Sequence, residues 1–112
     1  MQLQKILHKF TAKAKTLYKD SIVSIMLFGS YARRDNNPDS DIDIFIIVTL
    51  PDSDIKKLNN TIYDIAYDIG LEYDVDIEPI VVNDKYFAKW KNVHPFYQNI
   101  CQDGVTIYDQ AS

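Results

Sequence analysis

The feature that most constrains the fold is a Gly-Ser turn between two apolar runs. Residues 22–28 are mostly apolar, Gly29-Ser30 follows at once, and a polar, turn-rich stretch then leads to Asp41. A second apolar run, residues 44–48, begins directly after Asp43. Short apolar runs bounded by turn residues are typical of buried strands. The pattern therefore predicts two strands that are joined through a small turn and an acidic entry to the second strand.

The acidic entry is the first candidate site. Side chains alternate between the two faces of a strand, so Asp41 and Asp43 share one face, with roughly 6–7 Å between their Cα atoms. No Lys, Arg or His lies within residues 38–45 to neutralise them. Oxygen ligands of this kind suit Mg²⁺ or Mn²⁺ better than zinc. The pair is thus a candidate metal site, and a solvated strand start is the alternative.

The Gly-Ser turn is the second candidate site. Gly29 permits backbone geometry that a Cβ would forbid, and it lets a ligand come close to the backbone. Ser30 is expected to cap a short helix over residues 30–34, whose free N–H groups would attract phosphate. Arg33 lies one turn later and is a candidate phosphate contact. An ion pair between Arg33 and a nearby surface aspartate is the alternative.

These motifs together resemble a known family. Gly29-Ser30, ten residues, and then Asp41-x-Asp43 resembles the signature of the DNA polymerase beta-type nucleotidyltransferases. The fuller string Gly-Ser-Tyr-Ala-Arg with Asp-Ser-Asp-Ile-Asp is similar to the minimal nucleotidyltransferases of bacteria and archaea, and the resemblance covers most of the chain. It implies ATP or another NTP as donor and two Mg²⁺ ions. It also implies a HEPN-type toxin as partner, which many such proteins silence, as antitoxins, by adenylylating it.

The resemblance further implies a third carboxylate on a neighbouring strand. In residues 73–82, Asp76 and Glu78 share one face of the predicted strand. Asp76 fits the family pattern better and is expected to be the third catalytic and metal-binding carboxylate. Glu78 would replace it if the register differed. Pro79 cannot donate to a ladder of hydrogen bonds, so this strand is expected to be an edge strand or to bulge there.

The rest of the pattern predicts an α/β (α+β) fold, and the resemblance implies that this fold is of the polymerase beta nucleotidyltransferase type. A small mixed sheet would carry helices on one face, and the metal face would be the other, partly open one. Apolar residues at helical spacing predict long helices over residues 2–19 and 53–69, the second ended by Gly70. Further elements are predicted as a short helix capped by Asp84, a helix over residues 95–102 and a strand over residues 105–108.

Length, charge and cysteine content narrow the function. A chain of 112 residues is expected to form one domain, residues 1–112. The net charge of −4 argues against a nucleic-acid surface. The single cysteine, Cys101, excludes an internal disulfide and a zinc cluster. No apolar stretch reaches the roughly 18 residues of a membrane span, and the N-terminus lacks the apolar region of a signal peptide. A cytoplasmic location is expected.

Three functions remain open. Only about thirty residues follow the third predicted strand, which is little for a domain that would hold an acceptor. The preferred interpretation is a Mg²⁺-dependent enzyme that transfers AMP from ATP to a partner protein. The alternatives are an antitoxin that binds its partner with weak or no catalysis, and a small-molecule nucleotidyltransferase completed by dimerisation. Tyr63 and Tyr67 are expected at the rim of the core, with a partner surface as the alternative.

Overall fold

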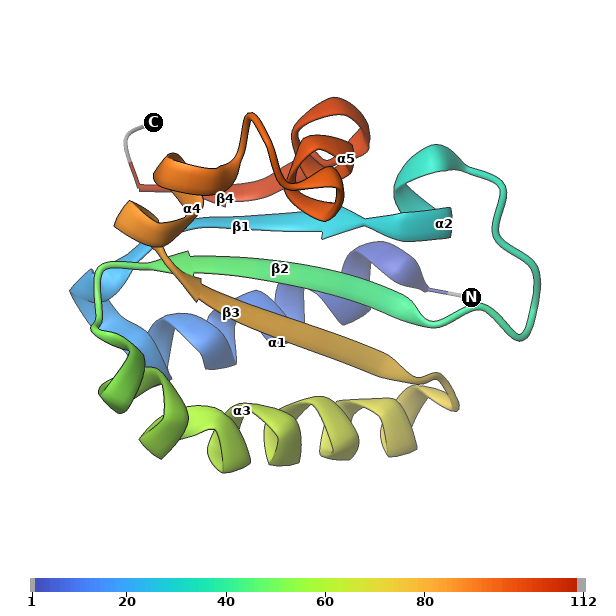
Figure 1. The fold of residues 1–112 in the computed structure, drawn as a ribbon. Helices are drawn as coiled ribbons and strands as arrows, with labels where there is room; N and C mark the ends of the chain where they lie inside the picture. The colour runs from blue at the N-terminus through green and yellow to red at the C-terminus, as the bar shows by residue number, and fades with distance from the viewer. Residues whose placement is uncertain (1, 111–112) are drawn as a thin grey trace.

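A four-stranded mixed sheet forms the centre of the molecule (Figure 1). The computed structural model describes residues 2–110; Met1, Ala111 and Ser112, which the expected domain includes, lie outside the described residues. The strand order is β3-β2-β1-β4. Strand β1 pairs antiparallel with both β2 and β4, and β2 pairs in parallel with β3. The strands are β1 (Ile22–Phe28), β2 (Ile42–Val48), β3 (Ile77–Asn83) and β4 (Val105–Asp109).

Helices cover both faces of this sheet. Two long helices lie on one face and two shorter ones on the other, while α2 stands at one end of the sheet (Figure 1). The expectation of helices on one face only is therefore wrong. The helices are α1 (Leu3–Tyr18), α2 (Gly29–Arg33), α3 (Asp52–Tyr73), α4 (Asp84–Trp90) and α5 (Pro95–Asp103), with a 3₁₀ turn, η1, at Lys19–Ser21.

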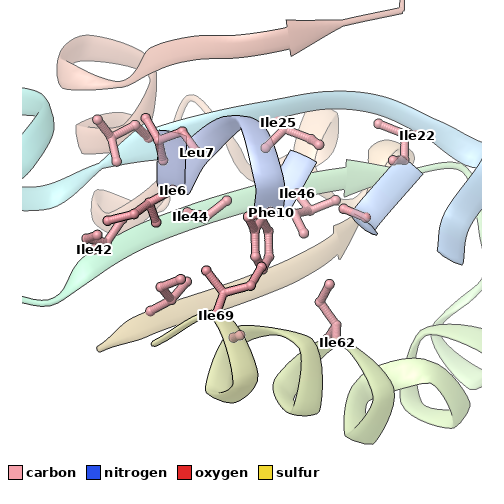
Figure 2. Packing of buried hydrophobic residues seen from close by; sticks show 14 of the residues in the cluster. Ile6, Leu7, Phe10, Ile22, Ile25, Ile42, Ile44, Ile46, Ile62 and Ile69 are labelled. Atoms are coloured by element: carbon pink, nitrogen blue, oxygen red, sulfur yellow. The ribbon is translucent and has the colours of Figure 1, made fainter. Parts of the chain in front are cut away.

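The main core lies between the sheet and the helix pair α1 and α3. Figure 2 shows Ile62 of α3 directed toward the sheet, and Phe10 of α1 belongs with it to one buried cluster that includes the isoleucines of β1 and β2. Both side chains are fully buried. Burying large apolar side chains is the main force that holds such layers together, at about 1.5–3 kcal/mol for each. The amphipathic stripes that predict the two long helices thus form one side of this core.

A second, aromatic core lies on the other face. Phe45 of β2 is fully buried and contacts the rings of Phe28, Phe87, Phe96 and Tyr97 at centroid distances of 5.4–6.2 Å. Strand β2 is apolar on both faces, because its alternate residues face the two cores in turn. Because β2 is buried on both faces, helices must cover both faces of the sheet.

The elements agree closely with the sequence-based ranges and differ informatively at two places, the start of α4 and the end of α3. Asn83, rather than Asp84, caps α4: its side chain accepts hydrogen bonds from the backbone N–H groups of Lys85 and Tyr86. Strand β3 is an edge strand, as Pro79 predicts, and it pairs with β2 without a bulge. No helix within residues 2–110 is long and apolar enough to cross a membrane.

The larger shift is at the end of α3. Gly70 was expected to end the helix, but α3 continues to Tyr73 and ends at Asp74, whose backbone is left-handed (φ 56°). Gly70 is buried, and a Cβ added there would lie 2.5 Å from the carbonyl oxygen of Val75. The glycine is therefore explained by the close return of the chain toward β3 rather than by a helix stop.

We predict that Gly70→Ala destabilises the protein, although alanine favours a helix by about 1 kcal/mol. The added methyl group would press on the Val75 carbonyl, and crowding of this kind costs about 1–3 kcal/mol. The free energy of unfolding in urea measures the change. A gain in stability of about 1 kcal/mol would contradict the packing described for Gly70.

Candidate active site

Three strand ends meet at one end of the sheet. Strand β1 ends there and runs into α2, while β2 and β3 both begin there (Figure 1). Asp43, the second residue of β2, lies opposite Phe28 on β1 and opposite Glu78 on β3. The register of the sheet thus brings one carboxylate from each of two neighbouring strands side by side.

Asp43 lies on the same face as the aromatic core. It alternates with Ile42 and Ile44, which belong to the main core, and it shares its face with Phe45. Asp43 is half-buried, whereas Glu78 and Asp41 are exposed. The aromatic layer of α4 and α5 therefore covers the middle of this face and leaves its acidic end accessible. The expectation of a partly open face holds for this end alone.

The electrostatics single out Asp43. Burial raises the pKa of its carboxyl group above the ordinary value of 3.8, and the neighbouring carboxylates of Asp41 and Glu78 raise it further. Arg33 acts in the opposite direction, but its effect is the smallest of the four. Removing a charge from water and placing like charges beside it both disfavour ionisation. The site therefore has an unneutralised excess of negative charge.

The position of the Asp43 side chain explains why residue 29 is a glycine. Its backbone has a φ of 73°, in the left-handed region that favours glycine, and it is the first residue of α2. A Cβ at this position would collide with the carboxylate of Asp43, lying 3.2 Å from its Cγ. The close approach expected at Gly29 is thus made by a side chain of the protein itself. A substitution here would disturb Asp43 and the backbone together.

The other two residues predicted to bind phosphate lie on α2. Ser30 is the second residue of the helix, and Phe28 occupies the cap position without a side-chain cap, so the expected capping by Ser30 is wrong. Arg33 forms an ion pair with Asp35, with 3.2 Å between Nε and Oδ2, and both side chains are well exposed. The surface alternative for Arg33 is therefore realised, although its charge still reaches Asp43.

The two candidates for the third carboxylate differ in position. Glu78 lies directly opposite Asp43 and raises its pKa. Asp76 precedes β3, is exposed, and accepts a hydrogen bond from the N–H of Ile42 through its backbone carbonyl, at 2.8 Å. It is not among the groups that shift the pKa of Asp43. Of the two candidates, the structure thus places Glu78, and not Asp76, directly opposite Asp43 in the sheet.

The donor chemistry of these residues fits a hard divalent cation. Carboxylate oxygens are the ligands that Mg²⁺ prefers, and a cation would relieve the repulsion that raises the pKa of Asp43. Within residues 2–110, no three acidic, His or Cys side chains converge closely enough to hold a metal ion as they stand. Binding a cation would thus require the carboxylates to turn toward one another.

Tyr63 and Tyr67 were expected at the rim of the core, but the structure places them on the surface. Their exposed fractions are 49% and 66%, and Leu71, one turn further along α3, is 65% exposed. The spacing of four residues along the helix was visible in the sequence, beside the buried stripe. Aromatic side chains next to a core stripe do not reveal from sequence alone whether another element covers them.

Comparisons with a family model and with known relatives indicate the same family. Residues 7–98 match the model of the family described as nucleotidyltransferase domain. A relative from Methanocaldococcus jannaschii, named "Putative protein adenylyltransferase MJ0604", is 34% identical over 108 residues, which are 96% of this chain and 100% of the relative. A second relative of that organism, with the same descriptive name, is 33% identical and aligns with 96% of this chain and 73% of its own length.

Solved structures of similar fold include an adenyltransferase and toxin-antitoxin structures. A spectinomycin adenyltransferase of Enterococcus faecialis, crystallised with ATP and spectinomycin, superposes with a TM-score of 0.69 at 15% identity, covering 96% of this chain and 56% of that one. A toxin-antitoxin structure with AMP-PNP gives a TM-score of 0.57 at 19% identity, covering 90% of this chain and 72% of that one. At these identities the likeness concerns the fold.

We predict that Asp43→Asn raises the melting temperature at pH 7 and lowers nucleotidyl transfer by more than about a hundredfold. Even residues that only support a metal ligand cost about 10–100-fold when lost. Folding raises the pKa of Asp43, so the folded protein holds this proton more tightly than the unfolded chain. Ionisation at higher pH therefore costs stability, and the variant avoids that cost.

Thermal melts of both proteins across pH measure this effect. The gain in melting temperature should be largest above the raised pKa and should shrink as the pH falls toward 3.8, the ordinary value. A lower melting temperature for the variant at pH 7 would mean that the Asp43 carboxylate stabilises the fold, and the assignment would fail.

We also predict that Glu78→Gln lowers the pKa of Asp43 toward its ordinary value more than Asp76→Asn does. Glu78 is opposite Asp43 and contributes to its raised pKa, whereas Asp76 does not. Each variant removes one charge, so the two are matched. An NMR titration of the Asp43 carboxyl carbon reads the result, and a larger effect from Asp76→Asn would transfer the role to Asp76.

Proposed function

Because the chain belongs to the nucleotidyltransferase domain family, we propose that it transfers AMP from ATP to a hydroxyl group of a partner protein. The single observation that carries this proposal is the row of carboxylates from β2 and β3 at the open end of the sheet, beside the turn at Gly29. Relatives named as protein adenylyltransferases align with 96% of this chain, which supports a protein as acceptor.

The reaction exchanges a phosphoanhydride bond of ATP for a phosphodiester bond to the acceptor. The acceptor oxygen bonds to the α-phosphorus of ATP, the bond from that phosphorus to the oxygen bridging the β-phosphorus breaks, and pyrophosphate leaves. The proton of the acceptor hydroxyl passes to a carboxylate at the site. Glu78 is our first choice for this base and Asp76 the second, because Glu78 is the direct neighbour of Asp43.

Asp41, Asp43 and Glu78, with Asp76 as the alternative, would hold two Mg²⁺ ions. When bound, these ions neutralise charge on the phosphates and on the leaving pyrophosphate. The strand register would hold the carboxylates in place, and the turn at Gly29 would leave space for the triphosphate. Gly29, Ser30 and Arg33 would contact that triphosphate, with Arg33 leaving its exposed ion pair with Asp35.

We further propose that the partner is a HEPN-type toxin and that this chain is its antitoxin in the cytoplasm, where ATP is available. Toxin-antitoxin structures of the same fold support this choice. A binding antitoxin without catalysis is the second candidate. It is favoured by the carboxylates, which within residues 2–110 do not converge into a metal site as they stand.

We predict that incubation with ATP, Mg²⁺ and the protein encoded beside this chain adds about 329 Da, one AMP group, to that protein. Intact-mass spectrometry measures the gain, and Asp41→Asn, which removes one carboxylate of the site, should abolish it. A partner that is bound and silenced but unmodified would favour the second candidate. Transfer that persists in Asp41→Asn would contradict the site.

A further inference from the structure

A groove lies next to the candidate active site and is not explained by nucleotide binding. It has a volume of about 830 Å³ and runs between the second half of α3, the loop at residues 38–40 and the chain from Asp74 to Glu78. Its size is within the range of about 300–1,000 Å³ that is usual for ligand sites. Asp76 and Glu78 line it, so the groove opens directly onto the carboxylates of the site.

The groove is strongly acidic. Five carboxylates line it and no Lys, Arg or His does; the five are Asp39, Asp64, Asp74, Asp76 and Glu78. Within residues 2–110, none of these five side chains takes part in an ion pair. Three of the five, Asp39, Asp64 and Asp74, lie outside the candidate metal site and would repel a triphosphate, so this part of the groove does not suit ATP. Charge complementarity instead favours a positively charged occupant.

One wall of the groove is apolar and exposed. Tyr63, Tyr67 and Leu71 line it at intervals of four residues along α3, with exposed fractions of 49%, 66% and 65%. They form one stripe on the helix, about 12 Å long at 1.5 Å per residue. Exposed aromatic and apolar side chains beside charged ones are typical of protein-binding surfaces. A small cation would use the charges but would leave most of this stripe uncovered.

We propose that this groove docks the acceptor protein through a Lys- or Arg-rich helical segment whose apolar face packs on Tyr63, Tyr67 and Leu71. The inference rests on the proposed function, because it makes the groove the acceptor side of that site. The basic side chains of the segment pair with the carboxylates of the groove, and its apolar residues cover the stripe on α3. Docking there brings an acceptor hydroxyl to the end of the groove at Glu78.

The test uses a synthetic amphipathic peptide of about four helical turns, made of Lys and Leu at helical spacing. Calorimetry measures its binding to the protein and to Asp64→Lys combined with Tyr67→Ala. Both residues are exposed groove residues outside the catalytic set. The matched control is Asp68→Lys combined with Tyr86→Ala, which makes the same exchanges at exposed positions that do not line the groove.

We expect the groove variant to weaken peptide binding at least tenfold and the control variant to change it less than twofold. A Glu/Leu peptide of the same length should not bind. Equal losses in the two variants would overturn the proposal. Spermine that binds as tightly as the peptide would also overturn it, because the groove would then recognise charge alone.

The acceptor protein separates this proposal from the proposed function. If AMP transfer to the partner proceeds in the native chain and is unchanged in the groove variant, the docking proposal fails. If no transfer occurs but the partner still binds tenfold more weakly to the groove variant, docking stands and the catalytic proposal fails. Melting temperatures of the two variants, expected to match, show that both are folded.

Discussion

The parallel register between β2 and β3 is the constraint on which the rest of the site depends. It places Glu78 opposite Asp43, and β1 on the other side places Phe28, and hence the turn at Gly29, next to the same aspartate. A slip of one residue would turn every side chain of β3 to the opposite face and take Glu78 away from the site. The close packing of Gly70 on Val75 fixes where the chain leaves α3 to enter β3.

The negative charge concentrated at the site does not stabilise the fold. Burial and two neighbouring carboxylates raise the pKa of Asp43, and the opposing effect of Arg33 is smaller than each of these. The two apolar cores, one on each face of β2, provide stability that offsets this unfavourable charge. Functional sites commonly hold such unfavourable arrangements, because the ligand that relieves them is then bound more strongly.

The strands and the acidic entry were predictable because local pattern determines them. Apolar runs marked β1 and β2, and the two-residue period predicted Asp41 beside Asp43; in the structure Asp41 lies directly before β2, and its charge acts on Asp43. What the sequence did not reveal depends on contacts between distant segments. The neighbour of Gly29 is Asp43, fourteen residues away in the chain, and the choice between Asp76 and Glu78 depends on the β2–β3 register. The exposure of Tyr67 depends on the absence of a covering element within residues 2–110.

The central claim is that the carboxylates of β2 and β3 form a nucleotide site that requires a divalent cation. Calorimetric titration of ATP into the protein, with Mg²⁺ and with the metal removed by a chelator, tests this most directly. The unneutralised charge around Asp43 would repel the triphosphate alone, so we expect binding with Mg²⁺ at least tenfold tighter than without it. Equal affinity under the two conditions would contradict the claim.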